Sequence, residues 1–115
     1  MPTARLEGYR FGTIVVDGRE ETRDLIVLPD RVVRSWWRRD GHGLVLEDLE
    51  GVLDELPERL IVGTGHDGRM RPDPIALEEL ERRGIHVEAL RTTEAVARYG
   101  ELDSRRTAAA LHLTC

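Results

Sequence analysis

Residues 59–90, which read RLIVGTGHDGRMRPDPIALEELERRGIHVEAL, decide the fold class of this chain. Leu60-Ile61-Val62 is a short apolar run typical of a buried strand, and a glycine-containing segment follows it. Asp73 before a proline is typical of the start of a helix, and Gly84 is typical of its end. Ile85 to Leu90 predicts a second strand. A strand, a helix and a strand in this order predict a right-handed βαβ unit with two parallel strands.

The first third of the chain favours antiparallel strands. Thr13 to Val16 is β-branched, and the Asp17-Gly18 that follows is typical of a tight hairpin turn. Further short strands are expected from Asp24 to Leu28 and from Arg31 to Trp37. This part therefore predicts an antiparallel hairpin layer.

Helical and strand patterns alternate in the rest of the chain. The apolar residues from Leu46 to Leu56 follow the spacing of one helix face, although Gly51 weakens that helix. Thr92 or Thr93 is expected to cap another helix that runs to about Leu102, and Thr107 to Leu113 predicts the last strand. We expect one α/β domain over residues 1–115, of three layers, with a mixed central sheet flanked by helices and the hairpin layer packed on it.

The composition narrows the classes of function. A chain of 115 residues fits one domain, and a net charge of −5 makes the whole chain a poor binder of polyanions. Cys115 is the only cysteine, so no internal disulfide is possible, which suits a reducing compartment. We see no targeting segment, and the apolar runs are far shorter than the roughly 20 residues of a membrane helix. The sequence therefore predicts a cytoplasmic protein.

A candidate ligand site lies where the two parallel strands of residues 59–90 end. Ligands bind beyond the carboxyl ends of parallel strands, glycines allow close approach, and the start of a helix favours an anion. The pattern is neither a dinucleotide-binding nor a Walker motif, and the glycines could simply turn the chain. The ligand-binding candidates at this rim are Gly63, Thr64, Gly65, His66, Arg69, Arg91 and Thr93.

A second candidate surface is the cluster of aromatic and basic residues at positions 34–39. Such a cluster suits a protein contact surface, and it also suits base stacking or phosphate contact. Because neighbouring side chains of a strand face opposite sides, one tryptophan is expected in the core and the other at a helix or a partner. The interaction candidates are Arg34, Trp36, Trp37 and Arg38, with Arg39 as a further nucleic-acid contact.

The sequence offers little for metal binding or nucleophilic catalysis. The four histidines lie far apart, so we predict no metal site and no cofactor. If the last strand continues, His112 and Cys115 point to opposite faces, which argues against a dyad. We identify no catalytic residue, and an enzyme is the less favoured class.

Several segments resemble a known family, in matching order and spacing over nearly the whole chain. They are Phe11-Gly12-Thr13, Asp17-Gly18, Asp24-Leu25-Ile26-Val27, Val32 to Arg38, Leu60 to Gly65, Gly84 to Glu88, Thr93-Glu94-Ala95 and Ala108 to His112. The chain resembles the family of unknown function that includes mitochondrial complex I assembly factor 3 and the adipogenesis-associated domain protein. The resemblance implies a three-layer α/β fold and no established enzymatic activity. Departures occur at Gly100 and at Ser104-Arg105-Arg106, where relatives often have an Asn and a Gly-Arg turn.

Three functions remain open at this point. The leading prediction is a protein-interaction or assembly module with a protein partner and no membrane partner. The alternatives are a small-molecule or anion binder, or an enzyme, that uses the rim at 63–71 and 91–94, and a nucleic-acid binder that uses 34–39. Fold alone does not choose among them.

Overall fold

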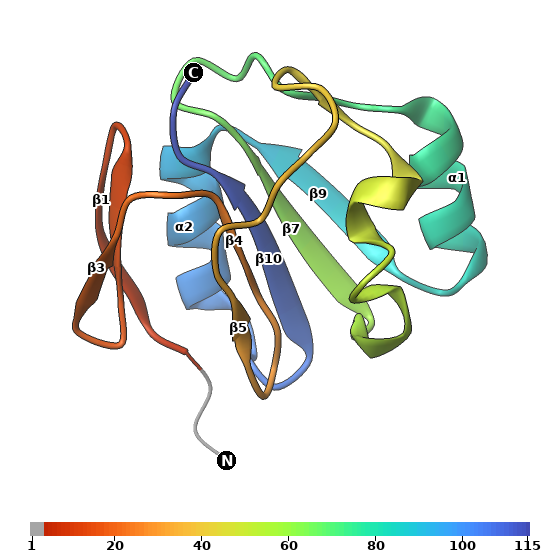
Figure 1. Ribbon diagram of the computed structural model, residues 1–115. Helices are drawn as coiled ribbons and strands as arrows, with labels where there is room; N and C mark the ends of the chain where they lie inside the picture. Colours follow the sequence, from red (N-terminus) through yellow and green to blue (C-terminus); the bar gives the residue numbers. More distant parts are fainter. Residues whose placement is uncertain (1–3) are drawn as a thin grey trace.

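The computed structural model describes residues 4–115. A five-stranded sheet with the strand order β5-β4-β10-β7-β9 forms its centre (Figure 1). The strands are β4 (Leu25–Val27), β5 (Val32–Val33), β7 (Arg59–Thr64), β9 (His86–Leu90) and β10 (Thr107–His112). Strands β7, β9 and β10 are parallel, whereas β4 and β5 are antiparallel to their neighbours. The sheet is therefore mixed, as the sequence predicts.

The predicted βαβ unit is present. Val62 of β7 is in register with Ala89 of β9, so the two strands run side by side in the same direction. Helix α1 (Pro74–Arg82) connects them, and the carboxylate of Asp73 accepts a hydrogen bond from the N–H of Ile75 at 3.2 Å. The second helix, α2 (Thr92–Glu101), follows β9 and leads to β10. Both parallel crossovers of the sheet thus contain a helix.

A second sheet, of three antiparallel strands, forms the hairpin layer. Its strands are β1 (Leu6–Arg10), β2 (Thr13–Val16) and β3 (Arg19–Glu21). Asp17 and Gly18 form the predicted turn between β2 and β3, with φ angles of 52° and 81°. Strand β4 is part of the central sheet instead, although it comes directly after this layer in the chain.

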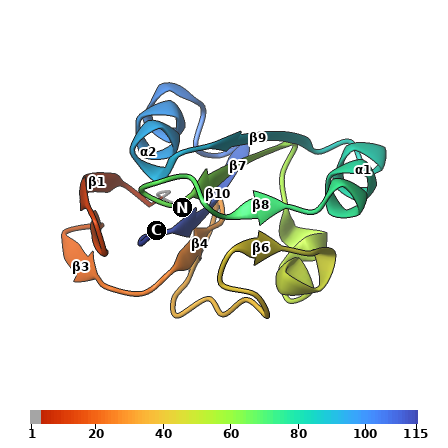
Figure 2. The ribbon, with the colours of Figure 1, turned by 90° about the horizontal axis from the view of Figure 1, so that it is seen from above.

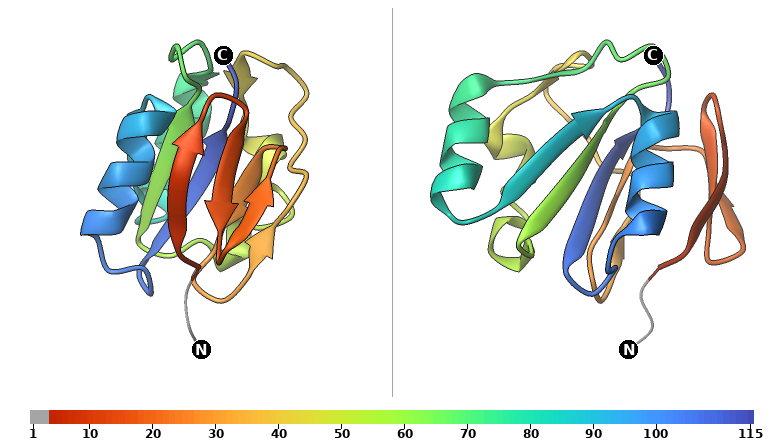
Figure 3. Two further views of the ribbon diagram at one scale, coloured as in Figure 1. Left: turned by 90° about the vertical axis from the view of Figure 1, so that its left-hand side faces the viewer. Right: turned by 180° about the vertical axis from the view of Figure 1, so that it is seen from behind.

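The central sheet has an apolar core on each face. One core contains Ile26, Leu60, Val62 and Leu80, and it lies beneath α1 and the segment of residues 44–56. The other contains Ile14, Leu25, Ile61, Ala95 and Leu111, among others, beneath α2 and the hairpin layer. Seen from above and from the side, α2 and β1–β3 lie on one side of the sheet and α1 on the other (Figures 2 and 3). This arrangement gives the three expected layers.

The predicted helix from Leu46 to Leu56 is wrong. The structure has two short 3-10 helices instead, η1 (Leu46–Leu49) and η2 (Leu53–Glu55), with Gly51 between them. The apolar residues at 46, 49, 53 and 56 are mostly three apart, a spacing that suits a 3-10 turn as well as an α-helix. The carboxylate of Asp48 also accepts hydrogen bonds from the N–H groups of Val45 at 2.9 Å and Arg39 at 3.1 Å, which fixes the local backbone.

The predicted strand from Arg31 to Trp37 is much shorter in the structure. Only Val32–Val33 pairs as β5. Ser35 then has a φ angle of 56°, a conformation that cannot continue a strand. After this turn the N–H of Trp36 donates to the carbonyl of Asp24 at 2.8 Å. The segment from Ser35 therefore leaves the sheet and crosses its edge as a loop.

Two short strands complete the fold. They are β6 (Gly43–Leu44) and β8 (Arg71–Pro72), and they pair in parallel. No helix within residues 4–115 combines the length and the apolar character that crossing a membrane requires.

Candidate functional site

The predicted rim exists as a place where the two segments meet. Arg91, the residue after β9, lies against the loop that follows β7. A Cβ on Gly68 of that loop would be 3.3 Å from Cγ of Arg91. The hydroxyl of Thr64 donates to the carbonyl of Leu90 at 3.0 Å. His66 lies further out, with its ring 5.7 Å from that of Phe11 at the tip of the hairpin layer. The two segments therefore meet as the parallel strands predict, and ligand binding by these residues stays a prediction.

The backbone of this rim is already hydrogen-bonded within the chain. The N–H of His66 donates to the carbonyl of Thr114 at 2.6 Å, and that of Arg69 donates to the carbonyl of Cys115 at 3.1 Å. A Cβ on Gly65 would lie only 2.6 Å from the carbonyl carbon of Cys115. Thr114 and Cys115 therefore lie across the glycine loop and use N–H groups that an anion would need.

The start of α2 also differs from the prediction. Arg91 occupies the N-cap position, and no side chain caps the helix. Thr92 is fully buried, and its hydroxyl donates to the carbonyl of His112 at 2.6 Å and accepts from the N–H of Gly65 at 2.9 Å. Thr93 is exposed. Thr92 therefore joins β7, α2 and β10, and ligand binding at the rim stays a prediction that the backbone geometry does not favour.

The cluster at positions 34–39 does not form one basic aromatic surface. Nε of Arg34 donates to the carboxylate of Glu21 at 2.5 Å. Trp36 is buried, and its indole N–H donates to the carbonyl of Asp48 at 2.9 Å. Arg38 is buried as well, whereas Trp37 is 76% exposed. Of the four interaction candidates, only Trp37 has a strongly exposed side chain that makes no hydrogen bond within the described part of the chain. Nucleic-acid binding stays a prediction, and the guanidinium groups of Arg34 and Arg38 are already paired with carboxylates.

Arg38 belongs to a buried polar network that sequence reasoning missed. Its Nη1 donates to Oδ2 of Asp24 at 2.6 Å, and its Nη2 donates to the carbonyl of Gly41 at 2.9 Å. The same Oδ2 lies 2.8 Å from Nδ1 of His112, and Oδ1 accepts from the N–H of Leu113 at 2.8 Å. The network therefore ties the loop after β5 to the residue before β4 and to the end of β10.

The geometry assigns the proton on the imidazole of His112. An ionised carboxylate can only accept, so Nδ1 of His112 carries a proton and donates it to Asp24. Nη2 of Arg38 lies 3.1 Å from the same Nδ1, which has no free lone pair to accept, and Nη2 donates its hydrogen bond to the carbonyl of Gly41. Nε of Arg38 and Nε2 of His112 are buried and have no hydrogen-bond partner within residues 4–115.

We expect acid to destabilise the protein partly through Asp24. Burial raises the pKa of its carboxyl, but hydrogen bonds from His112, Leu113 and Arg38 outweigh burial and hold the pKa below its usual 3.8. A lowered folded pKa contributes stability that is complete above pH 3.8 and is lost as the pH falls through the folded value. Urea unfolding from pH 6 down to about pH 2 should show this loss, and Asp24→Asn should flatten it. Equal slopes for both proteins would contradict the assignment.

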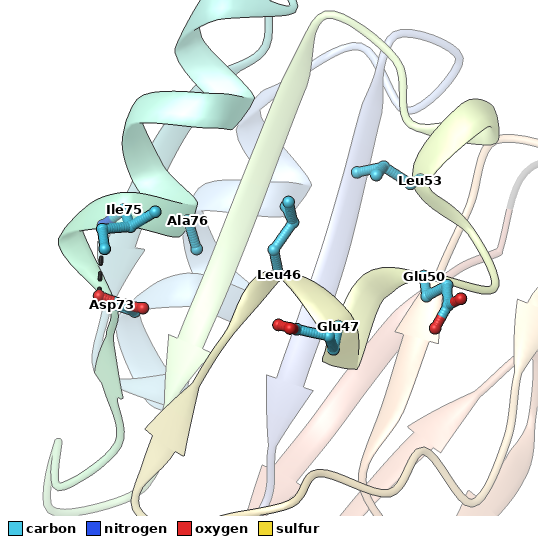
Figure 4. Close-up of a pocket in the computed structure, with 7 residues that line it drawn as sticks. All are labelled: Leu46, Glu47, Glu50, Leu53, Asp73, Ile75 and Ala76. Atoms are coloured by element: carbon cyan, nitrogen blue, oxygen red, sulfur yellow. Dashed lines mark hydrogen bonds between the residues drawn. The ribbon is translucent and has the colours of Figure 1, made fainter.

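A separate pocket of about 490 Å³ opens between η1 and α1 (Figure 4). Leu46 and Leu53 line it from the 3-10 segment, and Ala76 and Ile75 line it from the first turn of α1. Ile75 is 72% exposed, which is unusual for a large aliphatic side chain. We call this pocket the η1–α1 groove.

Carboxylates border the η1–α1 groove. Glu47 projects from η1 and Glu50 from the residue after it, and Asp73 is the N-cap of α1 (Figure 4). No arginine or lysine lines this pocket. Within residues 4–115 no ion pair engages the carboxylates of Glu47 or Glu50, whereas that of Asp73 accepts from the helix N–H of Ile75. The groove is thus apolar inside and negatively charged at its border.

Sequence reasoning had weak signals for both unpredicted features. Asp24 directly precedes a buried strand, and His112 ends one, but 88 positions separate them. For the groove, Ile75 is an aliphatic residue at the second position of a helix whose buried residues are Ala76 and Leu80. The apolar spacing of this helix predicts Ile75 on the same face as Leu80, and this prediction is wrong, because Ile75 is 72% exposed in the structure.

Fold and sites together define a small three-layer α/β domain built around a mixed central sheet. The chain belongs to the family described as a protein of unknown function (DUF498/DUF598), which it matches over residues 6–112.

Solved structures show the same fold. A conserved hypothetical protein from Pyrococcus horikoshii OT3 is 31% identical, with a TM-score of 0.81 over 96% of this chain and 99% of that one. A structure named MT938 is 33% identical, with a TM-score of 0.76 over 98% and 100% of the two chains. A Bordetella pertussis protein described as a Mth938-like domain is 23% identical, with a TM-score of 0.74 over 96% and 85%, and shares the fold.

Proposed function

We propose that this chain is a protein-interaction module that docks a partner protein at the η1–α1 groove. The observation that carries the proposal is the open apolar pocket with Ile75 exposed at its edge. Apolar area left in water beside a hollow, with polar residues around it, is typical of a protein contact surface. A partner that covers Ile75 would remove this area from water, which favours binding.

Two further considerations support an interaction role. The resemblance to the family that includes mitochondrial complex I assembly factor 3 suggests a role in assembly rather than in catalysis. At the rim of the parallel strands, backbone N–H groups that a small ligand would use are engaged by residues 114 and 115. A cytoplasmic location is part of the same proposal.

The substitution Ile75→Asp should remove the partner without unfolding the domain. Ile75 is exposed in the first turn of α1, where a negative charge is favourable, so the helix should keep its stability. We expect native co-purification of the tagged chain to recover a stoichiometric partner, and Ile75→Asp to reduce its amount by about tenfold.

Trp37→Asp is the matched control, because it puts the same charge at the other strongly exposed apolar residue that the predictions singled out. It should leave the amount of partner unchanged. Loss of the partner with Trp37→Asp alone would move the contact surface to the loop after β5. If no stoichiometric partner is recovered from the native source, the proposal is wrong.

A further inference from the structure

We infer that the η1–α1 groove takes a basic segment of a partner protein that inserts an aliphatic side chain, an inference that rests on the proposed function. The apolar lining indicates the anchor. Leu46 and Leu53 lie partly buried against the core beneath them, so the floor of the groove is held by the folded domain. Ala76 is a small buried residue on the opposite wall, which leaves room for an incoming side chain.

The charges at the border indicate the flanking residues of the partner. Glu47 and Glu50 are exposed and lie about one 3-10 turn apart, with Glu47 in η1 and Glu50 directly after it. Because their carboxylates have no ion-pair partner within the described chain, a cation there would meet two acceptors that are not already engaged. Arginine or lysine on either side of the aliphatic anchor therefore complements this border.

The length of the surface favours a peptide segment over a small cation. A second hollow of about 390 Å³ shares Leu53 with the first and continues to Gly84 after the end of α1. Asp54, Glu58 and Arg83 line this second part, where Asp54 pairs with Arg83 at 3.7 Å and Glu58 pairs with Arg106 at 3.2 Å. Within the described chain, the unpaired carboxylates therefore lie at the first hollow. The first hollow lies at the start of α1, which has 9 residues, and the second at its end, so about 13 Å separates them at 1.5 Å per residue. About four extended residues span that length.

The same charges argue against two other occupants. A second copy of this chain also carries a net charge of −5, so it would bring further negative charge to an acidic border. A nucleic acid would bring its phosphates to Glu47 and Glu50, with no cation lining the first pocket. A basic segment of a different protein is the occupant that the charges favour.

Selection from a library of random peptides of about ten residues, displayed against the immobilised full chain, tests the inference without presuming a sequence. We expect the enriched peptides to carry at least two basic residues around a leucine, isoleucine or valine. For a synthetic copy of the strongest peptide, Glu47→Arg together with Glu50→Arg should weaken binding by about tenfold or more. Binding should also weaken with salt, because the border is exposed.

Glu78→Arg together with Glu81→Arg is the matched control. Both residues are exposed on α1 and line neither hollow, and the pair changes the net charge by the same amount. We expect about twofold weakening at most. Circular dichroism and thermal unfolding of both double variants should match the unsubstituted chain, because every replaced side chain is exposed.

Several results would overturn the inference. These are enriched peptides that are neutral or acidic, no enrichment at all, an equal effect of both double variants, or equally tight binding of arginine methyl ester. The proposed function fails separately, if the native source yields no stoichiometric partner or if Ile75→Asp retains it. A partner that depends on Ile75 but has no basic docking segment would preserve the function and refute the partner chemistry.

Discussion

Asp24→Ala is expected to lower the free energy of unfolding by about 3–5 kcal/mol, because it removes the carboxylate that pairs with a buried guanidinium. Arg38 is 7% exposed, and its Nη1 lies 2.6 Å from Oδ2 of Asp24. The substitution also takes acceptors from Nδ1 of His112 and the N–H of Leu113. Chemical denaturation monitored by tryptophan fluorescence measures the loss, and the buried Trp36 reports on the same region.

A second substitution separates the cost of leaving the charge of Arg38 unpaired from the cost of removing the side chain of Asp24. Arg38→Met added to Asp24→Ala should restore part of the stability, since replacing both partners of a buried pair by apolar groups is much less costly than removing one. The control is Glu55→Ala, which breaks the exposed ion pair with Arg31 at 2.6 Å and should cost far less. If Asp24→Ala costs no more than Glu55→Ala, the network does not hold the loop after β5.

The second large effect is expected for Gly65→Ala, at about 2–4 kcal/mol, because strain and overlap act at the same residue. Gly65 has a φ angle of 105°, which side chains with a Cβ rarely adopt. The added methyl would also lie 2.6 Å from the carbonyl oxygen of Cys115 and 2.9 Å from Cδ2 of His112. Residues 113–115 or the end of β10 would have to move, and the hydrogen bonds from the loop would weaken.

Gly12→Ala isolates the strain from the overlap. Its φ angle of 83° is also in the left-handed region, but a Cβ there would contact nothing within 4 Å. We expect about 1 kcal/mol for this control, measured by the same denaturation experiment. Equal losses for the two variants would mean that residues 113–115 do not pack on the glycine loop in solution.

The sequence predicts correctly those turns and strands that neighbouring residues determine. Asp17-Gly18 forms the expected turn because both residues tolerate positive φ, and the run Leu60-Ile61-Val62 forms the expected buried strand. The same reasoning fails for the segment from Leu46 to Leu56, because its spacing suits two helix types. Hydrogen bonds to Asp48 from the neighbouring Val45 and from Arg39, nine residues away, fix its backbone.

The candidate sites were harder to predict because they join residues that are far apart in the chain. The η1–α1 groove needs Leu53 and Ile75 on facing elements, and nothing in either segment alone indicates the space between them. The rim at Gly65 was located correctly, but its coverage by residues 113–115 depends on where β10 ends. Arg38 belonged to a cluster predicted to make contacts outside the domain, and its partner is an internal carboxylate.

The position of β10 has a consequence for folding of the protein. This strand is the last in sequence, yet it lies in the middle of the sheet between β4 and β7. Until residues 107–112 pair, β5-β4 and β7-β9 are two partial sheets, each with an unpaired apolar edge. Such edges favour aggregation, so folding of the domain depends on β10 pairing with both of them.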